Sequence, residues 1–123
     1  MFVRKLDDCE EFIAGDNCLL REILNPYKEV LALHYSLAHA VIRAGETTWS
    51  HRLRSSEVYY ILEGEGIMHI NGEDARVTPG STVYIPPLTN QSITNTGKSD
   101  LRFICIVDPA WRKEDEEVMT RLG

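Results

Sequence analysis

The sequence predicts an all-β protein, a sandwich or a barrel. Short apolar or alternating runs separated by turn residues recur through most of the chain, and few stretches repeat with helical period before its end. With 123 residues, 43% of them hydrophobic and 26% charged, the chain has the size and composition of one globular domain. We therefore expect a single domain over residues 1–123, with its core over about 18–107.

Alternation and turn residues together indicate short strands along most of the chain. The expected strands span residues 2–5, 18–24, 35–43, 57–63, 66–71, 74–78, 82–86, 91–96 and 101–107. Many short strands with frequent turns are typical of a sandwich or a barrel.

The segment 57–72 is expected to form a hairpin with its turn at a pair of glycines, followed by an Asn-Gly turn signal. Such pairing would place Ile61 opposite Met68 on the inner face, which Glu57 and Tyr59 share by period two. The other face is apolar as well, and this predicts a homodimer in which a partner subunit covers it. That outer face carries Tyr60, Leu62, Ile67 and His69.

The tail over residues 108–123 is expected to be helical. Asp108 is a helix-capping residue type, and Pro109 after it suits the first helical position. We expect a short helix from Arg112 to Leu122.

Net charge and cysteine content indicate which binding partners and which cell compartment to expect. Thirteen Lys and Arg against nineteen Asp and Glu give a net charge of −6, which disfavours nucleic acid and membrane surfaces as partners. The chain has no apolar run of membrane-spanning length, and its first residues lack the apolar core of a signal peptide. Three widely spaced cysteines fit free thiols in a reducing compartment, so we expect a cytoplasmic protein.

The chemistry is expected around His51 and Glu57. Five residues separate them, enough for one strand to end and the next to begin with both side chains facing inward. A neutral imidazole and a carboxylate are the groups that hold a divalent transition metal or that form an acid/base pair. His34, His39 and His69 are expected to lie outside this site, with His39 alternating outward to the surface or an interface.

The residues around this pair resemble the first motif of the cupin superfamily. That motif is a glycine, five residues, a His-x-His pair, three or four residues, a glutamate, six residues and a glycine. Gly45, His51, Glu57 and Gly64 occupy four of its five marked positions, and Leu53 stands where the second histidine would be.

The second cupin motif is similar to the segment from Gly80 to Asn95. Gly80, Pro86 and Asn95 match, whereas Leu88 replaces a turn glycine and Gln91 replaces the histidine that usually binds metal. The resemblance implies a double-stranded β-helix, or jelly-roll barrel.

The resemblance also implies a ligand set and a cavity. His51, Glu57 and the amide oxygen of Gln91 would hold Mn, Fe, Ni or Zn, with positions left open for a small oxygen-rich metabolite. The cavity or ligand contacts expected beside them are Leu53, Tyr59, Ala38, Phe103 and Cys105.

Two other functions are compatible with these residues. Leu53 in place of a histidine favours a metal-free module that binds a small metabolite without catalysis. Acid/base catalysis by Glu57 and His51 without metal is the third, as in cupins similar to sugar-nucleotide epimerases. Only Arg43, Arg52 and Arg54 near the barrel mouth could hold a phosphorylated sugar.

Overall fold

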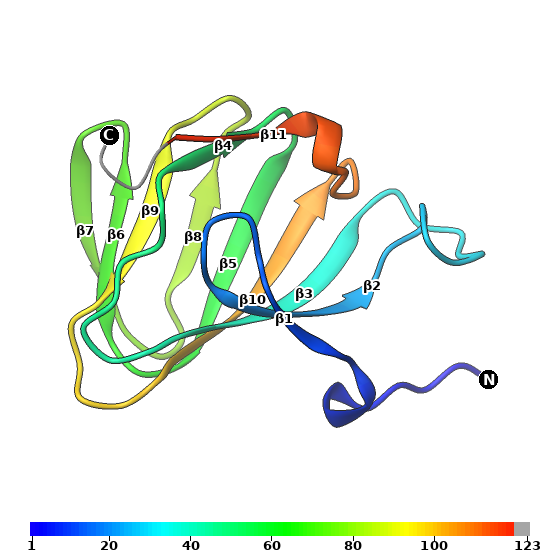
Figure 1. The fold of residues 1–123 in the computed structure, drawn as a ribbon, viewed down its shortest axis with the longest axis horizontal. Coiled ribbons are helices and arrows are strands. Elements are labelled where there is room, and N and C mark those ends of the chain that lie inside the picture. Colours follow the sequence, from blue (N-terminus) through cyan, green and yellow to red (C-terminus); the bar gives the residue numbers. More distant parts are fainter. Residues whose placement is uncertain (120–123) are drawn as a thin grey trace.

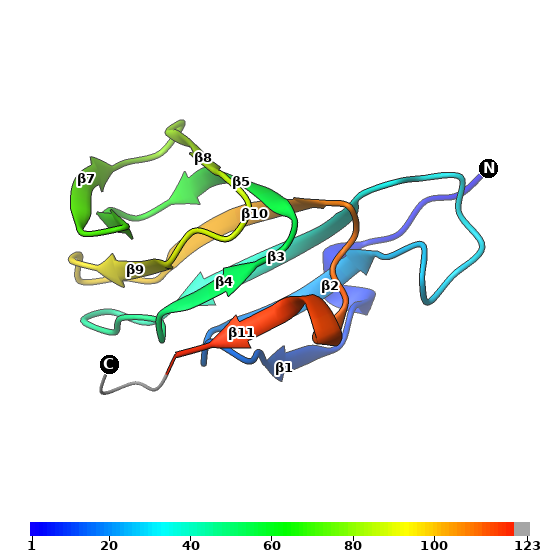
Figure 2. The ribbon, with the colours of Figure 1, turned by 90° about the horizontal axis from the view of Figure 1, so that it is seen from above.

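Two antiparallel sheets make up the computed structural model, which describes residues 1–119 (Figure 1). The first sheet has the order β1 (Glu11–Ile13), β2 (Leu19–Leu24), β3 (Ser36–Ile42), β10 (Leu101–Asp108), β5 (Ser56–Glu63) and β8 (Thr82–Ile85). The second has the order β11 (Glu116–Val118), β4 (His51–Leu53), β9 (Gln91–Asn95), β6 (Gly66–Ile70) and β7 (Glu73–Val77). The sheets face each other as the two layers of a jelly-roll barrel (Figure 2).

The core lies between the two sheets because alternate residues of each strand face inward. Ile61 and Phe103 fill it from the first sheet, and Met68 and Ile93 from the second. All four side chains are at most 2% exposed. The period-two alternation of the sequence therefore sets which residues are inside.

Most of the predicted strands are present within a residue or two, but the two ends of the chain differ. Residues 2–5 form no strand; a 3-10 turn at Leu6–Asp8 follows, and β1 begins only at Glu11. Arg4 is held by its side chain, which donates to the carbonyl of Ile23 and pairs with Glu29, so this segment joins no ladder. Strand β4 is not among the predicted strands, because three residues are too few to show a period-two alternation of apolar and polar side chains.

The predicted hairpin over 57–72 is wrong as a pairing. Strand β5 pairs with β10 and β8, and β6 pairs with β7 and β9, so the chain crosses between sheets at Gly64. The Asn71-Gly72 turn instead joins β6 to β7, with both residues at positive φ. The inward assignment holds nevertheless, because Ile61 and Met68 both point into the core from opposite layers. The expected outer face is divided between the two sheets, with Tyr60 and Leu62 on β5 and with Ile67 and His69 on β6.

The C-terminal helix predicted for 112–122 is reduced to one 3-10 turn, Lys113–Asp115. Strand β11 follows it and pairs with β4, with Glu116 beside Leu53 and Val118 beside His51. Residues 120–122 of the predicted helix lie outside the described residues. A free edge at β4 explains the difference, since backbone groups of a strand edge stabilise a short tail as a strand.

His39 lies on the outer face of β3, as its alternation predicts, but it is 5% exposed and not a surface residue. Arg21 of β2 and Ile104 of β10 flank it in the ladder. Burial, followed by the nearby Arg102 and Arg21, lowers the pKa of its imidazole.

Candidate functional site

The barrel encloses a cavity of about 140 Å³ between the first sheet and the strands β4 and β11. The β1–β2 loop closes one side of it, tied down where the backbone N–H of Trp49 donates to the carbonyl of Asp16 at 2.8 Å. Gly15 in this loop lies against Glu116, since a Cβ there would be 2.8 Å from Oε1 of that residue. The cavity is smaller than the sites that hold drug-sized ligands, so it suits a small metabolite.

The residues expected to contact a ligand all lie along this cavity. Strand β5 contributes Glu57 and Tyr59, and β4 contributes His51 and Leu53. Ala38 of β3 and, from β10, Phe103 and Cys105 complete this set. Gln91, the remaining expected site residue, is not part of the cavity wall and lies behind Glu57 and Tyr59.

A chain of polar contacts joins four of these residues. The amide nitrogen of Gln91 donates to Oε1 of Glu57 at 2.5 Å, and its amide oxygen accepts from the Tyr59 hydroxyl at 2.9 Å. Nε2 of His51 lies 3.9 Å from the same Oε1 of Glu57. Gln91 is 2% exposed, so it positions the carboxylate and the phenol from within the protein.

The tautomer of His51 follows from its other nitrogen. Nδ1 lies 3.3 Å from the carbonyl oxygen of Trp49 and 3.7 Å from Oδ2 of Asp16, and both are acceptors. The surroundings of the ring therefore favour the proton on Nδ1. In the neutral ring, Nε2 then presents its lone pair toward Glu57.

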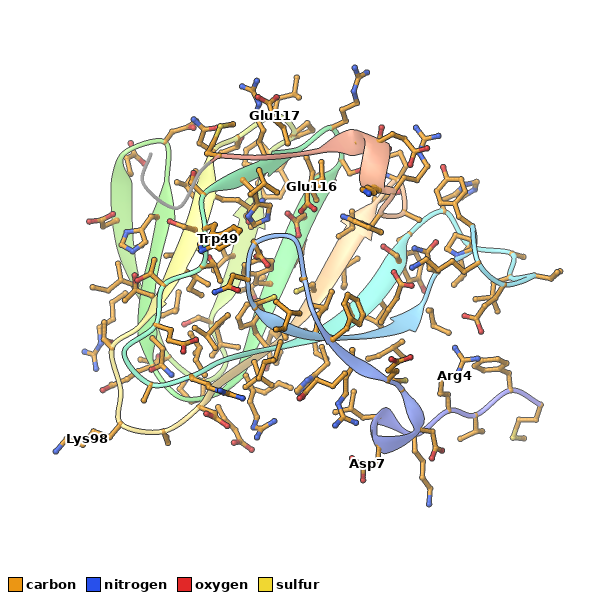
Figure 3. All side chains as sticks on the ribbon, viewed as in Figure 1. Arg4, Asp7, Trp49, Lys98, Glu116 and Glu117 are labelled. Atoms are coloured by element: carbon orange, nitrogen blue, oxygen red, sulfur yellow. The ribbon has the colours of Figure 1, made fainter. Side chains whose placement is uncertain are left out.

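Sequence reasoning missed three acidic residues of the cavity, Asp16, Glu22 and Glu116. Asp16 comes from the β1–β2 loop, Glu22 from β2, and Glu116 from β11, which pairs with β4 beside Leu53. All three lie outside the two motifs, and none of these positions carries a spacing that would point to the site. Only the folding of both chain ends over the barrel brings them there. Glu116 is labelled on the C-terminal segment in Figure 3.

Burial changes the acid strength of these groups. It raises the pKa of Glu57 from an ordinary 4.5 to about 7, while His51 and the Gln91 hydrogen bond act in the opposite direction. Burial also raises the pKa of Glu116, opposed by His51 and reinforced by Asp16. The Tyr59 hydroxyl and the Cys105 thiol have pKa values raised well above their usual range by burial, so both stay protonated near neutral pH.

In the orientation that the structure has, the Gln91 amide does not complete the expected transition-metal ligand set. The oxygen of Gln91, which would bind a metal, accepts from Tyr59, and the nitrogen faces Glu57 instead. Within residues 1–119, no group of three His, Cys, Asp or Glu side chains is placed to hold a metal ion. A site for such a metal needs three or four converging donors, and of the three expected ligands only His51 and Glu57 turn suitable atoms toward each other.

A family model described as the cupin domain matches residues 38–107, which run from β3 to β10 and include His51, Glu57 and Gln91. This chain is a cupin. The expected jelly roll is thereby confirmed, and the family commonly binds transition metals.

Similarity to known proteins extends over most of this cupin. An uncharacterized protein of Methanocaldococcus jannaschii, MJ1618, is 39% identical over 116 residues, which cover 92% of this chain and 90% of that protein. The oxalate-binding protein of Thermotoga maritima is 41% identical over 51 residues, 42% of either chain. The crystal structure of a predicted oxalate decarboxylase from Thermotoga maritima superposes with a TM-score of 0.77, covering 88% of this chain and 99% of that one at 22% identity, which is a likeness of fold.

Within residues 1–119, no helix is long and apolar enough to span a bilayer.

Proposed function

We propose that this cupin binds a small polar metabolite in its cavity and that Glu57 exchanges a proton with it. The single observation that supports this most is the placement of the Glu57 carboxylate in the cavity wall, held by Gln91 and facing Nε2 of His51. A ligand atom next to both groups could lose a proton to one and receive it from the other.

The surroundings suit such proton transfer. A buried carboxyl with a pKa of about 7 is populated in both protonation states near neutral pH. The walls of Leu53, Phe103 and Ala38 are apolar, and such surroundings strengthen the polar contacts beside them. The chain itself supplies both the acid/base group and the means to orient it.

Binding and proton exchange can be tested together. In a thermal-shift screen of small polar metabolites with a chelator present, a ligand at a hundred times its Kd should stabilise the native state by about 2.7 kcal/mol. For that ligand in deuterated water, nuclear magnetic resonance should show exchange of one carbon-bound proton, and Glu57→Gln should abolish it while binding persists.

Glu63→Gln is the matched control, since Glu63 lies on the same strand with its side chain largely exposed beside Arg102. It should keep both binding and exchange. No exchange in wild-type protein with a ligand bound would leave a binding module and contradict the catalytic part of the proposal.

A metal-dependent cupin is the second candidate, favoured by the way β4, β5 and β9 bring His51, Glu57 and Gln91 into one chain of contacts. It requires the Gln91 amide to turn its oxygen toward Glu57. Elemental analysis after loading with Mn, Fe, Ni or Zn decides between the candidates. Near-stoichiometric metal that is lost in His51→Ala and Gln91→Ala would establish the metal centre, whereas metal-free protein after every loading would exclude it.

We also propose that the protein acts in the cytoplasm as a homodimer. The outer face of β5, β8 and β10 is an exposed apolar surface that a second copy could cover. Its exposed side chains are Tyr60, Leu62, Tyr84 and Ile106. Three unpaired, buried cysteines fit a reducing compartment.

A further inference from the structure

The walls of the cavity carry one sign of charge. Four carboxylates line it, from Asp16, Glu22, Glu57 and Glu116. Among the described lining residues there is one histidine and no lysine or arginine. Carboxylates that share a small cavity repel one another, and each raises the pKa of its neighbours, as Asp16 does for Glu57 and for Glu116. An anionic ligand would add to this repulsion, whereas a cation would relieve it.

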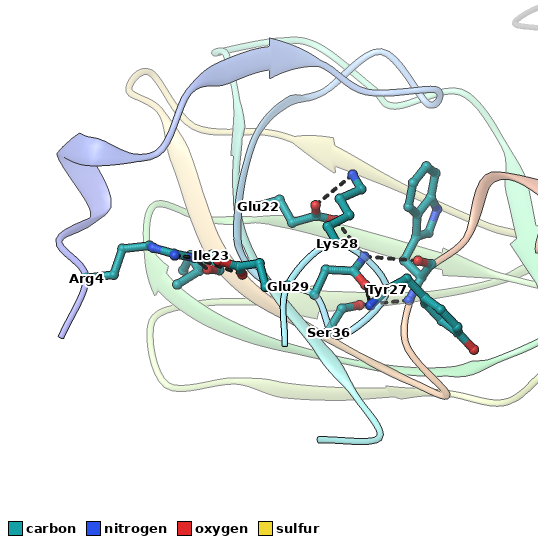
Figure 4. A network of polar contacts seen from close by, with 9 residues as sticks. Arg4, Glu22, Ile23, Tyr27, Lys28, Glu29 and Ser36 are labelled. Atoms are coloured by element: carbon teal, nitrogen blue, oxygen red, sulfur yellow. Dashed lines mark hydrogen bonds and ion pairs between the residues drawn. The ribbon is translucent and has the colours of Figure 1, made fainter. Parts of the chain in front are cut away.

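An ammonium group already occupies the rim of this cavity. Nζ of Lys28 lies 2.7 Å from Oε1 of Glu22 and 5.4 Å from the centre of the Trp111 ring (Figure 4). Glu22 and Trp111 are both lining residues, while Lys28 extends to them from outside the cavity wall. The rim therefore binds a tethered ammonium by a carboxylate and an aromatic face, the two partners that recognise organic cations.

A buried side chain holds this pair in place. Nδ2 of Asn25 donates to Oε2 of Glu22 and to the carbonyl oxygen of Trp111, both at 3.0 Å. Asn25 is 1% exposed, and Ser36 anchors the backbone N–H of Trp111 at 2.9 Å. The carboxylate of Glu22 and the backbone of Trp111 are thus positioned by the fold, and Lys28, with more than half of its side chain exposed, is free to leave.

The remaining wall suits the body of such a ligand. Phe12, Tyr59 and Phe103 add aromatic surface inside the cavity, and the Tyr59 and Phe103 rings lie 4.5 Å apart. Apolar and aromatic walls with carboxylates at a few points are typical of sites for small organic ammonium compounds.

We infer that the ligand of this cavity is a small primary ammonium compound whose ammonium group replaces Lys28 between Glu22 and Trp111. This inference rests on the proposed function and names the class of metabolite that the same cavity takes. The acidic walls disfavour free carboxylates such as oxalate, although relatives of this chain carry oxalate in their names.

The test compares two-carbon ligands that differ in charge. Ethanolamine, ethylene glycol, glycolate and oxalate are titrated into the full chain by calorimetry, with a chelator present, and each is also scored by its thermal shift. Ethanolamine should bind at least about tenfold more tightly than ethylene glycol, and the two anions should not bind.

Two variants place the ammonium site, and two further variants are controls. Glu22→Gln should weaken ethanolamine binding about tenfold. Lys28→Gln should strengthen it several-fold, because it removes the competing ammonium of the chain. Lys98→Gln makes the same change of charge in the β9–β10 loop, far from the rim (Figure 3), and should leave the affinity unchanged. Glu117→Gln is the control for the acidic charge lost in Glu22→Gln. Glu117 pairs with Arg52 and is not a lining residue of the cavity, unlike its neighbour Glu116, so this variant should bind ethanolamine as wild type does.

The outcomes separate the two proposals. Preferential binding of glycolate or oxalate, or equal binding of ethylene glycol, would overturn the ammonium ligand and leave the proposed small-molecule function standing. Equal affinity in Lys28→Gln and wild type would overturn the placement at Glu22 and Trp111. Failure of all four probes, together with an empty metabolite screen, would overturn the proposed function and this inference with it.

Discussion

Gln91 donates its amide N–H to Glu57 at 2.5 Å and accepts the hydroxyl proton of Tyr59 with its oxygen. The position that would carry a metal-binding histidine in the cupin motif therefore holds a residue that bridges two other site residues. An amide supplies a donor and an acceptor at once, whereas an ionised carboxylate in this place would supply acceptors only.

Removing this bridge should destabilise the protein. Gln91→Ala leaves the buried Glu57 carboxyl and the Tyr59 hydroxyl short of a partner, at an expected cost of about 2–3 kcal/mol in the free energy of unfolding. Urea unfolding measures it. Asn90→Ala, one residue earlier and exposed, should change the free energy by less than about 0.5 kcal/mol. Equal stability of Gln91→Ala and wild type would show that the bridge does not contribute.

Glu57 should make stability fall as the pH rises. Its folded pKa of about 7 exceeds the ordinary 4.5, so the folded state keeps a proton that the unfolded chain releases between these values. The contribution is fully present below about pH 4.5 and is lost as the pH rises through about 7, with a magnitude on the order of 3 kcal/mol.

Unfolding free energies at several pH values across this window check the prediction. Glu57→Gln can still accept from Gln91 but cannot titrate, so its curve should be flatter than that of wild type. If the unfolding free energies of wild type and Glu57→Gln changed equally over this pH window, the assignment to Glu57 would be contradicted.

The crossing between sheets at Gly64 should not tolerate a side chain. Gly64 has a φ of +85°, and a Cβ there would lie 2.7 Å from the backbone oxygen of Asp100 and 2.9 Å from Cα of Leu101. Gly64→Ala therefore adds a clash to the strain of about 1–2 kcal/mol that any alanine meets in the left-handed region.

Gly72→Ala is the matched comparison for the same measurement. Its φ is +83°, but nothing lies within 4 Å of the added Cβ, so it should show the backbone strain alone. We expect Gly64→Ala to unfold at a lower urea concentration than Gly72→Ala. Equal midpoints would mean that the β5–β6 crossing moves to accept the methyl group.

The outer face of the first sheet should hold a dimer together. Tyr60 of β5 is 47% exposed there, beside Tyr84 and Ile106 of the neighbouring strands. Tyr60→Glu buries an unpaired charge in the proposed interface and should shift sedimentation from dimer to monomer. Val30→Glu, at a fully exposed position of the β2–β3 loop, should stay dimeric; a monomeric wild-type protein would refute the interface.

The sequence by itself determined the fold class and much of the cavity. Period-two alternation marks Tyr59, Ile61 and Cys105 as inward-facing without any knowledge of strand partners, because each residue's face depends only on its own strand. His51 and Glu57 likewise meet as their spacing predicts, because only five residues separate them in the sequence.

Only the tertiary structure decided what depends on pairing over long distances. The glycine pair at Gly64 and Gly66 looks the same in a hairpin and in a crossing between sheets, and the competition of β10 and β8 for the edges of β5 selects the crossing. The tail becomes a strand because β4 offers it a free edge, and that pairing brings Glu116 to the cavity. The acidic character of the site thus comes from both ends of the chain, which no local pattern connects.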